Sequence, residues 1–129
     1  MAIPNNLKPA DRLYTAYFAD IATASDAYVP IAGVGYIKSI NITPHVTLTG
    51  AATVVTPYVN TTQMQINGSN TTLSLAASRA AGSVNTITLT NGQQRVVDGD
   101  VIKLSTDGGA TNGSAVPATI IIVVSDIGG

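Results

Sequence analysis

Short stretches in which apolar and polar residues alternate, separated by Gly, Pro, Asn and Asp, recur along the whole chain. Over residues 36–42, Tyr36, Lys38, Ile40 and Ile42 alternate with the residues between them, which is the two-residue period of a half-buried strand. The same pattern, or a β-branched run bounded by turn residues, predicts strands over residues 13–20, 28–31, 36–42, 46–50, 53–59, 63–66, 86–90, 93–97, 101–105 and 120–124.

Turn residues indicate how these segments connect. Two Asn-Gly pairs, Asn67-Gly68 and Asn91-Gly92, suit the positive backbone angles of a tight hairpin. The second predicts the stronger hairpin, between residues 86–90 and 93–97. Residues 22–26 are predicted as a turn, and residues 28–31 as a short edge strand, because an edge tolerates the proline in that segment.

The last predicted strand, residues 120–124, consists of five consecutive β-branched apolar residues. If such a segment were exposed, it would tend to pair edge to edge with other chains. We therefore expect it at the centre of a sheet, with both ladders and both faces covered. A subunit interface could supply part of that cover.

Composition supports a β-rich fold, because Thr, Ser, Val, Ile, Asn and Gly are abundant and Glu is absent. A short helix remains the alternative for residues 13–20, where alanines favour it. A length of 129 residues suits one domain. About eight short strands at regular spacing predict an all-β antiparallel sandwich of jelly-roll type over residues 13–129. An extended N-terminal arm is expected over residues 1–12.

Several classes of function are excluded by composition. The chain has no Cys and one His, so it cannot form disulfides, a thiolate nucleophile or a multi-histidine metal site. Six Lys and Arg against seven Asp give a net charge of −1 with no basic cluster, so nucleic acid is not an expected partner. The apolar run 118–124 is far shorter than the roughly 20 residues that span a bilayer as a helix. No secretory signal is visible, so we expect a soluble protein with no membrane partner.

His45 makes a catalytic triad arithmetically possible. No Gly-x-Ser-x-Gly elbow occurs, and Ser69, Ser83 and Ser114 each follow a glycine in a predicted turn or loop. We interpret His45 as a turn or interface residue and expect no enzymatic activity and no catalytic residue.

Asp98 and Asp100, together with Asp107, are candidate cation ligands, because hard cations such as Ca²⁺ take clustered carboxylate and carbonyl oxygens. The longer alternation of oxygen ligands that forms a calcium loop does not follow them. Two aspartate turns are the favoured interpretation, and no metal or cofactor is expected.

Two further features concern binding. We expect the tyrosines in the core of the sandwich, although tyrosine is also enriched at surfaces that bind a partner. Loops at the end of a sandwich often present ligand sites, so a receptor- or carbohydrate-binding module, with its site in the 109–117 loop, is the alternative function. The absence of Trp and of any aromatic residue in that loop weighs against sugar stacking. The tyrosines are Tyr14, Tyr17, Tyr28, Tyr36 and Tyr58, and the solitary cations Lys38, Arg79, Arg95 and Lys103 are expected on solvated surfaces.

Four turn-and-strand segments carry a resemblance to a known family. They are Asp20-Ile21-Ala22-Thr23-Ala24 leading to Tyr28-Val29-Pro30-Ile31-Ala32-Gly33, then Tyr36-Ile37-Lys38-Ser39-Ile40, then Gln65-Ile66-Asn67-Gly68, and finally Val97-Asp98-Gly99-Asp100-Val101-Ile102 with Ser105-Thr106-Asp107-Gly108-Gly109. In this order they resemble the head decoration proteins of tailed bacteriophages, which are small virion proteins with a jelly-roll-like β-sandwich. The likeness spans residues 13–126.

The resemblance implies a non-enzymatic protein that binds the outer surface of the icosahedral head. Such proteins commonly sit as trimers over junctions between major capsid protein subunits and reinforce the shell without a cofactor. The family offers no catalytic or ligand motif to transfer. In this setting, the alternative is a receptor- or carbohydrate-binding module of a head fibre or tail. We therefore expect a homotrimer on the outer surface of the virion capsid, assembled in the host cytoplasm, with the major capsid protein as its partner and the 1–12 arm docked along the lattice.

Overall fold

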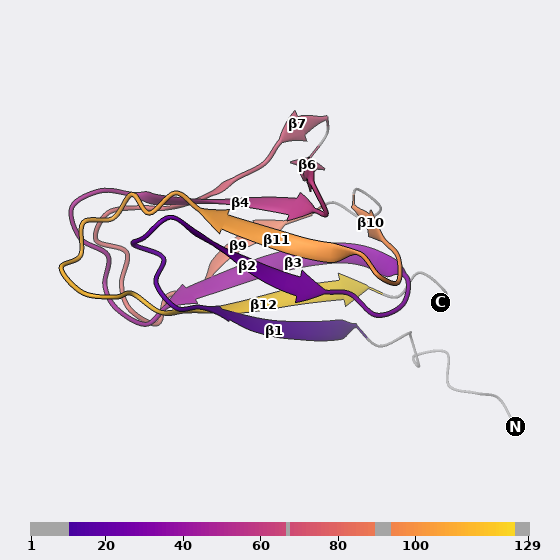
Figure 1. The fold of residues 1–129 in the computed structure, drawn as a ribbon, viewed down its shortest axis with the longest axis horizontal. Helices are drawn as coiled ribbons and strands as arrows, with labels where there is room; N and C mark the ends of the chain where they lie inside the picture. Colours follow the sequence, from indigo (N-terminus) through magenta and orange to yellow (C-terminus); the bar gives the residue numbers. More distant parts are fainter. Residues whose placement is uncertain (1–10, 67, 90–93, 126–129) are drawn as a thin grey trace, which may run out of the picture.

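The computed structural model describes residues 11–66, 68–89 and 94–125. Every regular secondary-structure element among these residues is a β-strand. Two antiparallel sheets pack face to face (Figure 1), which confirms the predicted all-β sandwich. The segment predicted at 13–20 is the strand β1 (Arg12–Phe18) and not a short helix. It begins at the last residue of the predicted arm, of which residues 1–10 lie outside the described residues.

The first sheet has β12 (Ala118–Ser125) at its centre, between β1 and β3 (Gly35–Pro44). The other edge of β3 pairs with β9 (Asn85–Thr88) and then with β10 (Arg95–Val96). These two short strands run in the same direction along β3, one after the other. The predicted hairpin between residues 86–90 and 93–97 is therefore wrong, because both flanking segments pair with β3 instead of with each other.

The second sheet is built on β11 (Val101–Thr106), which lies between β2 (Ser25–Pro30) and β4 (Thr53–Val59). The other edge of β4 pairs with β5 (Thr62–Gln63) and β8 (Leu73–Leu75). β2 is an edge strand, as its proline predicts. It begins three residues earlier than expected, because Ser25, Asp26 and Ala27 pair with β11 and are not part of the turn.

A small hairpin projects from the sandwich beside β4 (Figure 1). It consists of β6 (Gln65–Ile66) and β7 (Ser69–Asn70), which pair antiparallel. The hairpin predicted around Asn67-Gly68 is confirmed by this pairing, and Gly68 has the positive φ of 80° that the turn requires. Asn67 itself lies outside the described residues.

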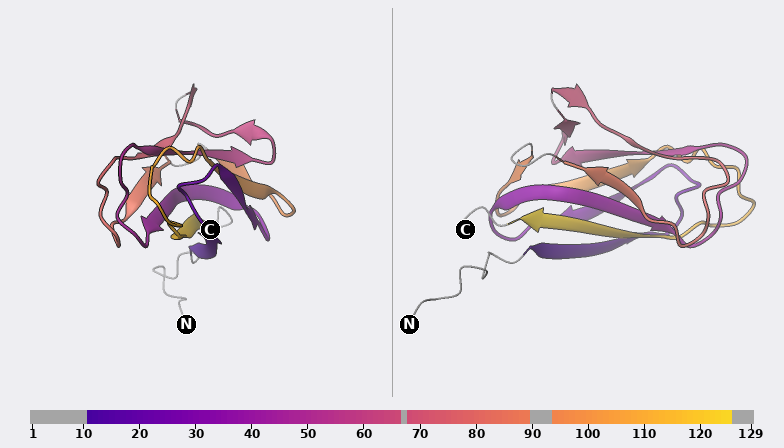
Figure 2. Two further views of the ribbon diagram at one scale, coloured as in Figure 1. Left: turned by 60° about the vertical axis from the view of Figure 1, so that its left-hand side comes forward. Right: turned by 180° about the vertical axis from the view of Figure 1, so that it is seen from behind.

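The strands pair from the ends of the chain inwards. β1 pairs with β12, β2 with β11, β3 with β9 and β4 with β8. The chain therefore follows the course of one long hairpin that is folded over into two sheets. Connections 19–24, 45–52, 76–84 and 107–117 gather at one end of the sandwich, whereas β1 begins and β12 ends at the other (Figures 1 and 2).

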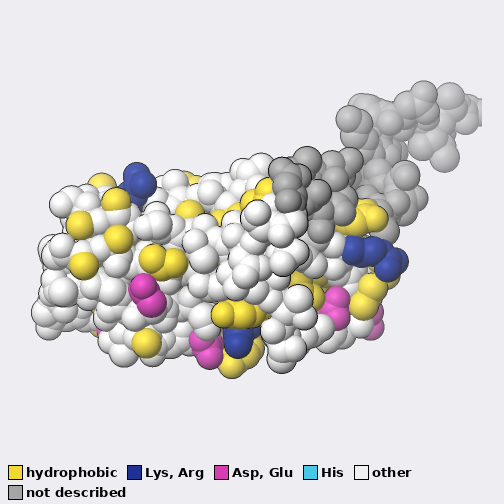
Figure 3. All heavy atoms as spheres, turned by 90° about the horizontal axis from the view of Figure 1, so that it is seen from above, with side chains coloured by type: hydrophobic (Ala, Val, Ile, Leu, Met, Phe, Trp, Pro, Cys, Tyr) yellow, Lys and Arg dark blue, Asp and Glu magenta, His cyan; other side chains and the backbone are white. Residues whose placement is uncertain are grey.

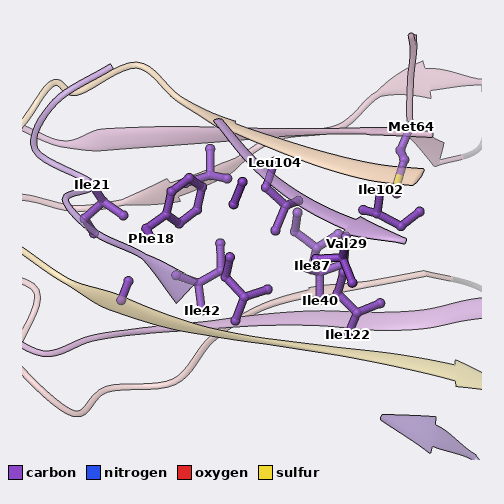
Figure 4. Packing of buried hydrophobic residues seen from close by; sticks show 14 of the residues in the cluster. Phe18, Ile21, Val29, Ile40, Ile42, Met64, Ile87, Ile102, Leu104 and Ile122 are labelled. Atoms are coloured by element: carbon purple, nitrogen blue, oxygen red, sulfur yellow. The ribbon is translucent and has the colours of Figure 1, made fainter. Parts of the chain in front are cut away.

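Aliphatic side chains from the inner faces of both sheets form the core (Figure 4). The single phenylalanine, Phe18, lies with Ile21 toward the end that holds the four connections, and Met64 lies toward the opposite end. Each fully buried aliphatic side chain stabilises the fold by about 1.5–3 kcal/mol. Between these ends, Ile40, Ile42, Ile87 and Ile122 of the first sheet meet Val29, Ile102 and Leu104 of the second.

β12 is central, as predicted, but only one of its faces is buried. Both of its ladders are paired, to β1 and β3. Ala118, Ile120, Ile122 and Val124 are fully buried, whereas Ile121 on the opposite face is 37% exposed. The single chain therefore leaves one face of β12 partly open, and the cover of that face by a subunit interface stays a prediction.

A β-bulge changes the predicted face pattern of β3. The register with β12 shifts between Val123, opposite Ser39, and Val124, opposite Ile37, so Lys38 is the extra residue of β3. Beyond the bulge Ile37 is buried and Lys38 is exposed, which reverses the faces that strict alternation predicts.

Two local expectations fail for reasons of connectivity. Residues 46–50 are not a strand, because here the chain crosses from the first sheet to the second. Leu48 still fills the end of the core and is fully buried, and its backbone bonds to Ser78 and Arg79. β8, in contrast, was not predicted, because only Leu73 and Leu75 mark its buried side.

Candidate functional site

His45 lies on the surface just after β3 and contacts no catalytic partner in the part of the chain described. Its Nε2 lies 2.7 Å from Oγ1 of Thr119, and its backbone N–H donates to the carbonyl oxygen of Pro117 at 2.8 Å. A triad needs a nucleophile and an orienting carboxylate on the two ring nitrogens. The ring instead joins the end of β3 to the start of β12.

Asp98 and Asp100 hold the turn between β10 and β11. Oδ1 of Asp98 accepts the N–H of Gly33 at 3.0 Å, and Oδ2 of Asp100 accepts the N–H of Val97 at 2.9 Å. Oδ1 of Asp100 accepts a bond from the side chain of Asn60 at 3.1 Å. Asp100 therefore closes its own turn, as the interpretation as an aspartate turn expects, whereas Asp98 ties this turn to the connection between β2 and β3.

Asp107 lies at the opposite end of β11 from this pair. Its Oδ1 accepts the N–H groups of Val54 and Gly109, both at 2.9 Å. The six-residue strand β11 separates it from Asp100 by roughly 20 Å, so the structure does not bring the three candidate ligands together. Within residues 11–66, 68–89 and 94–125, no group of three or more His, Cys, Asp or Glu could hold a metal ion.

The 109–117 loop is fastened to the connection between β3 and β4. The Asn112 side chain accepts the N–H of Thr49 at 3.0 Å and donates to the carbonyl oxygen of Thr47 at 2.9 Å. The N–H of Thr111 donates to the carbonyl oxygen of Thr49 at 2.8 Å. These bonds attach the loop to the connection between β3 and β4. The Asn112 amide and the backbone groups that form them are therefore already hydrogen-bonded within the chain.

Asp20 closes the same end of the molecule. Its Oδ1 accepts the N–H groups of Ala22 and Val116, both at 2.9 Å, and its Oδ2 accepts the Thr23 hydroxyl at 2.8 Å. The bond from Val116, reinforced by those from Thr23 and Ala22, lowers the pKa of Asp20 against the opposing effect of desolvation. Asp20 therefore ties the β1–β2 connection to the segment before β12.

The outer face of β1 and β12 carries an apolar patch, which we call the β1–β12 face: Leu13, Tyr17, Ile121 and Val123. Leu13 lies directly opposite Val123, and Ile121 lies opposite Thr15, between Leu13 and Tyr17 on β1. Leu13 is 66% and Tyr17 67% exposed. Leu13 and Tyr17 are four residues apart on β1 and so share one face of the strand, and the pairing with β12 shows what lies beside them.

The outer face of the second sheet carries a transverse line of three side chains, which we call the tyrosine row: Tyr28 on β2, Lys103 on β11 and Tyr58 on β4. Lys103 lies directly opposite both tyrosines in the two ladders. Its Nζ is 4.4 Å from the centre of the Tyr58 ring, and Tyr28 is 60% exposed. Sequence reasoning missed this row because its members are far apart in the chain and only strand pairing brings them together.

Tyr17 and Tyr28 are therefore exposed, so the expectation that the tyrosines lie in the core is wrong for these two. Tyr14 packs against the core and donates its hydroxyl to the carbonyl oxygen of Ala32 at 2.9 Å. Among the solitary cations, Lys38 pairs with Asp11 at 2.9 Å in an exposed ion pair. Such pairs contribute little to stability.

A surface hollow of about 210 Å³ lies beside the β3 bulge. Tyr36, Lys38, Thr88 and Leu89 contribute to its lining. Lys38 is the charged group there and is already paired with Asp11, so the hollow gathers no set of groups suited to acid–base or nucleophilic chemistry.

Comparison of the sequence with models of known protein families and with curated proteins finds no match. Among the residues that the structure describes, none belongs to a helix long and apolar enough to cross a membrane.

Proposed function

We propose that this chain is a non-enzymatic structural protein of a bacteriophage virion, which assembles as a homotrimer and binds the outer surface of the capsid. It would stabilise the shell by contacting the lattice of the major capsid protein. The observation that carries this proposal is the β1–β12 face, whose aliphatic and aromatic side chains remain in solvent on a single chain.

Burial of this face against another copy of the chain has a clear physical advantage. A contiguous apolar patch on a soluble protein marks an interaction surface. β1 is also an edge strand of seven residues without proline, and its one charged side chain, Arg12, donates to the carbonyl oxygens of Ala32 and Val34 of the same chain. A neighbouring copy that covers the patch would shield both the side chains and the strand edge.

Threefold symmetry constrains what this face can meet. In a ring of three copies, the contact is heterologous, so the β1–β12 face of one copy packs on a different surface of the next. A stable contact of this kind buries about 800 Å² on each partner. The remaining surfaces stay available for the capsid lattice.

The topology supports the same proposal. We infer that the nested pairing of β1 with β12, β2 with β11, β3 with β9 and β4 with β8 is that of a jelly roll. This fold is common among viral capsid and surface proteins, and it agrees with the resemblance to head decoration proteins. The candidate cation ligands support a structural role as well, because Asp98, Asp100 and Asp107 each accept backbone N–H groups.

The proposal is tested by light scattering and by sedimentation with capsids from which accessory proteins have been stripped. We expect a mass three times that of one chain and saturable co-sedimentation with the shells. A monomer that stays in the supernatant at every salt concentration would overturn the proposal.

Leu13→Ser tests the β1–β12 face itself. It removes about 1–2 kcal/mol of interface stabilisation, so the dissociation constant of the oligomer should rise roughly tenfold. Val84→Ser is the matched control, because Val84 is 67% exposed just before β9 and is not one of the four residues of this face. Equal oligomer stability in both variants would exclude the face as the interface.

A further inference from the structure

We propose that the outer face of the second sheet is a binding site for a neutral oligosaccharide, with the tyrosine row as its stacking platform. This proposal does not rest on the virion role, because it concerns the opposite side of the sandwich from the β1–β12 face. It also differs from the site expected in the 109–117 loop.

The three strands β2, β11 and β4 place the rings in register. Neighbouring strands lie about 4.8 Å apart, so Tyr28 and Tyr58 stand about 10 Å apart across the sheet. This span matches about two pyranose rings laid side by side. Lys103 stands between the tyrosines with its ammonium group 4.4 Å from the centre of the Tyr58 ring, so it covers part of that ring and leaves Tyr28 as the main stacking surface. Tyr28 keeps 60% of its surface open to a ligand.

A row of oxygen-bearing side chains runs beside the tyrosine row. Asp26, Ser105 and Thr56 lie opposite one another, one strand period away from Tyr28, Lys103 and Tyr58. The Ser105 hydroxyl donates to Oδ1 of Asp26, and the Tyr28 hydroxyl lies 3.4 Å from Oδ2. Asp26 is exposed, so its carboxylate can accept further hydrogen bonds.

This pairing of rows fits the chemistry of a sugar. A pyranose presents a face of C–H groups that stacks on an aromatic ring and a rim of hydroxyls that needs acceptors and donors. The tyrosine row supplies the first, and the Asp26–Ser105–Thr56 row supplies the second. Asp26 and Lys103 carry opposite charges, so the platform has no net charge and favours a neutral ligand.

The surroundings of the row favour a saccharide over a protein partner. Figure 3 looks onto this sheet, where hydrophobic side chains are scattered in small groups among the white atoms of the backbone and of the other side chains. Near the lower margin a basic side chain stands between hydrophobic ones, beside an acidic one. The β1–β12 face brings the aliphatic side chains of Leu13, Ile121 and Val123 together, whereas the tyrosine row and the Asp26–Ser105–Thr56 row contain no Ala, Val, Ile, Leu or Met.

The experiment uses the full chain and a panel of neutral trisaccharides: maltotriose, cellotriose and β-1,4-galactotriose. Each is titrated into ¹⁵N-labelled protein, and amide shifts are followed by NMR. We expect at least one sugar to bind saturably, with dissociation constants between about 10 μM and 1 mM. The shifts should be confined to β2, β11 and β4.

Variants decide whether the tyrosine row is responsible. Tyr28→Ala should weaken binding at least tenfold, whereas Tyr28→Phe, which keeps the ring, should weaken it less than threefold. Tyr36→Ala, which removes a half-buried tyrosine of the other sheet, should leave affinity unchanged.

Three outcomes would overturn the proposal. The first is no binding of any of the three sugars and none on a broad glycan array. The second is binding that Tyr28→Ala leaves intact. The third is a set of amide shifts that maps to the 109–117 loop. A fourth outcome, loss of capsid sedimentation in Tyr28→Ala without any sugar binding, would assign this face to a protein partner instead. The oligomer mass and capsid binding of the wild type are measured separately, so the two proposals fail independently.

Discussion

At the scale of single residues, aspartate acts in this protein mainly as an acceptor for backbone N–H groups. Asp20, Asp98, Asp100 and Asp107 each accept at least one such bond. An ionised carboxylate offers only acceptors, and three of these bonds come from residues distant in the sequence, namely Val116, Gly33 and Val54. Residues whose type suggests a ligand or an acid are thereby committed to holding loops.

Asp20→Ala should lower the free energy of unfolding by about 1–2 kcal/mol at neutral pH, because the N–H groups of Ala22 and Val116 lose their shared acceptor. Asp20→Asn keeps an acceptor oxygen and should lose less. Urea denaturation followed by circular dichroism measures both variants. An alanine variant as stable as the wild type would show that water replaces these bonds without cost.

The same residue should make stability depend on pH. The Val116 bond is the main cause of the lowered pKa, so the folded protein releases this proton more readily than the unfolded chain does. The contribution of Asp20 to the free energy of unfolding is present above the ordinary pKa of 3.8 and is lost as pH falls through the lowered pKa. Between about pH 6 and pH 3, the wild type should therefore lose more stability than Asp20→Asn. An equal loss of stability with falling pH in both proteins would contradict the assignment of this pH dependence to Asp20.

At the scale of the strand, β12 combines a buried face with an exposed one. Ile122 is fully buried between the sheets, and its neighbour Ile121 points outward at 37% exposure. Ile122→Ala should cost about 3–4 kcal/mol, since it leaves a cavity in the core, whereas Ile121→Ala should cost about 1 kcal/mol. Denaturant titration of the two variants provides the comparison. Equal losses would mean that the outer face is covered in solution, even at low protein concentration.

The bulge in β3 shows how one strand can depart from its own alternation. Lys38 is the extra residue, and from that point Ile37 rather than Tyr36 faces the core. Both faces of this segment carry apolar residues, so periodicity alone cannot decide between them. The decision is made by pairing with β12, whose buried residue Val124 lies opposite Ile37.

At the scale of the whole molecule, nested pairing makes the fold dependent on distant contacts. Phe18 lies opposite Ala118, so the chain closes a loop of about 100 residues before this ladder forms. Refolding should therefore take milliseconds to seconds, as in other proteins dominated by non-local pairing. Stopped-flow dilution from urea with tyrosine fluorescence measures it. A microsecond phase with the full amplitude would contradict this expectation.

Local sequence determined the elements and their buried sides wherever one face was clearly apolar. Alternation predicted β1, β4 and β11, and the β-branched run predicted the central position of β12. These outcomes follow from short-range physics, because a strand must hide its apolar side and a turn needs residues that tolerate its backbone angles.

Only the tertiary structure decided which segments became neighbours. It placed β9 and β10 along β3 in place of a hairpin, and it separated Asp107 from Asp98 and Asp100. It also brought Tyr28, Lys103 and Tyr58 into one row. Residue type and spacing do not indicate which strands pair. The free energy that selects these pairings comes from burying two sheets against each other, which involves the whole chain.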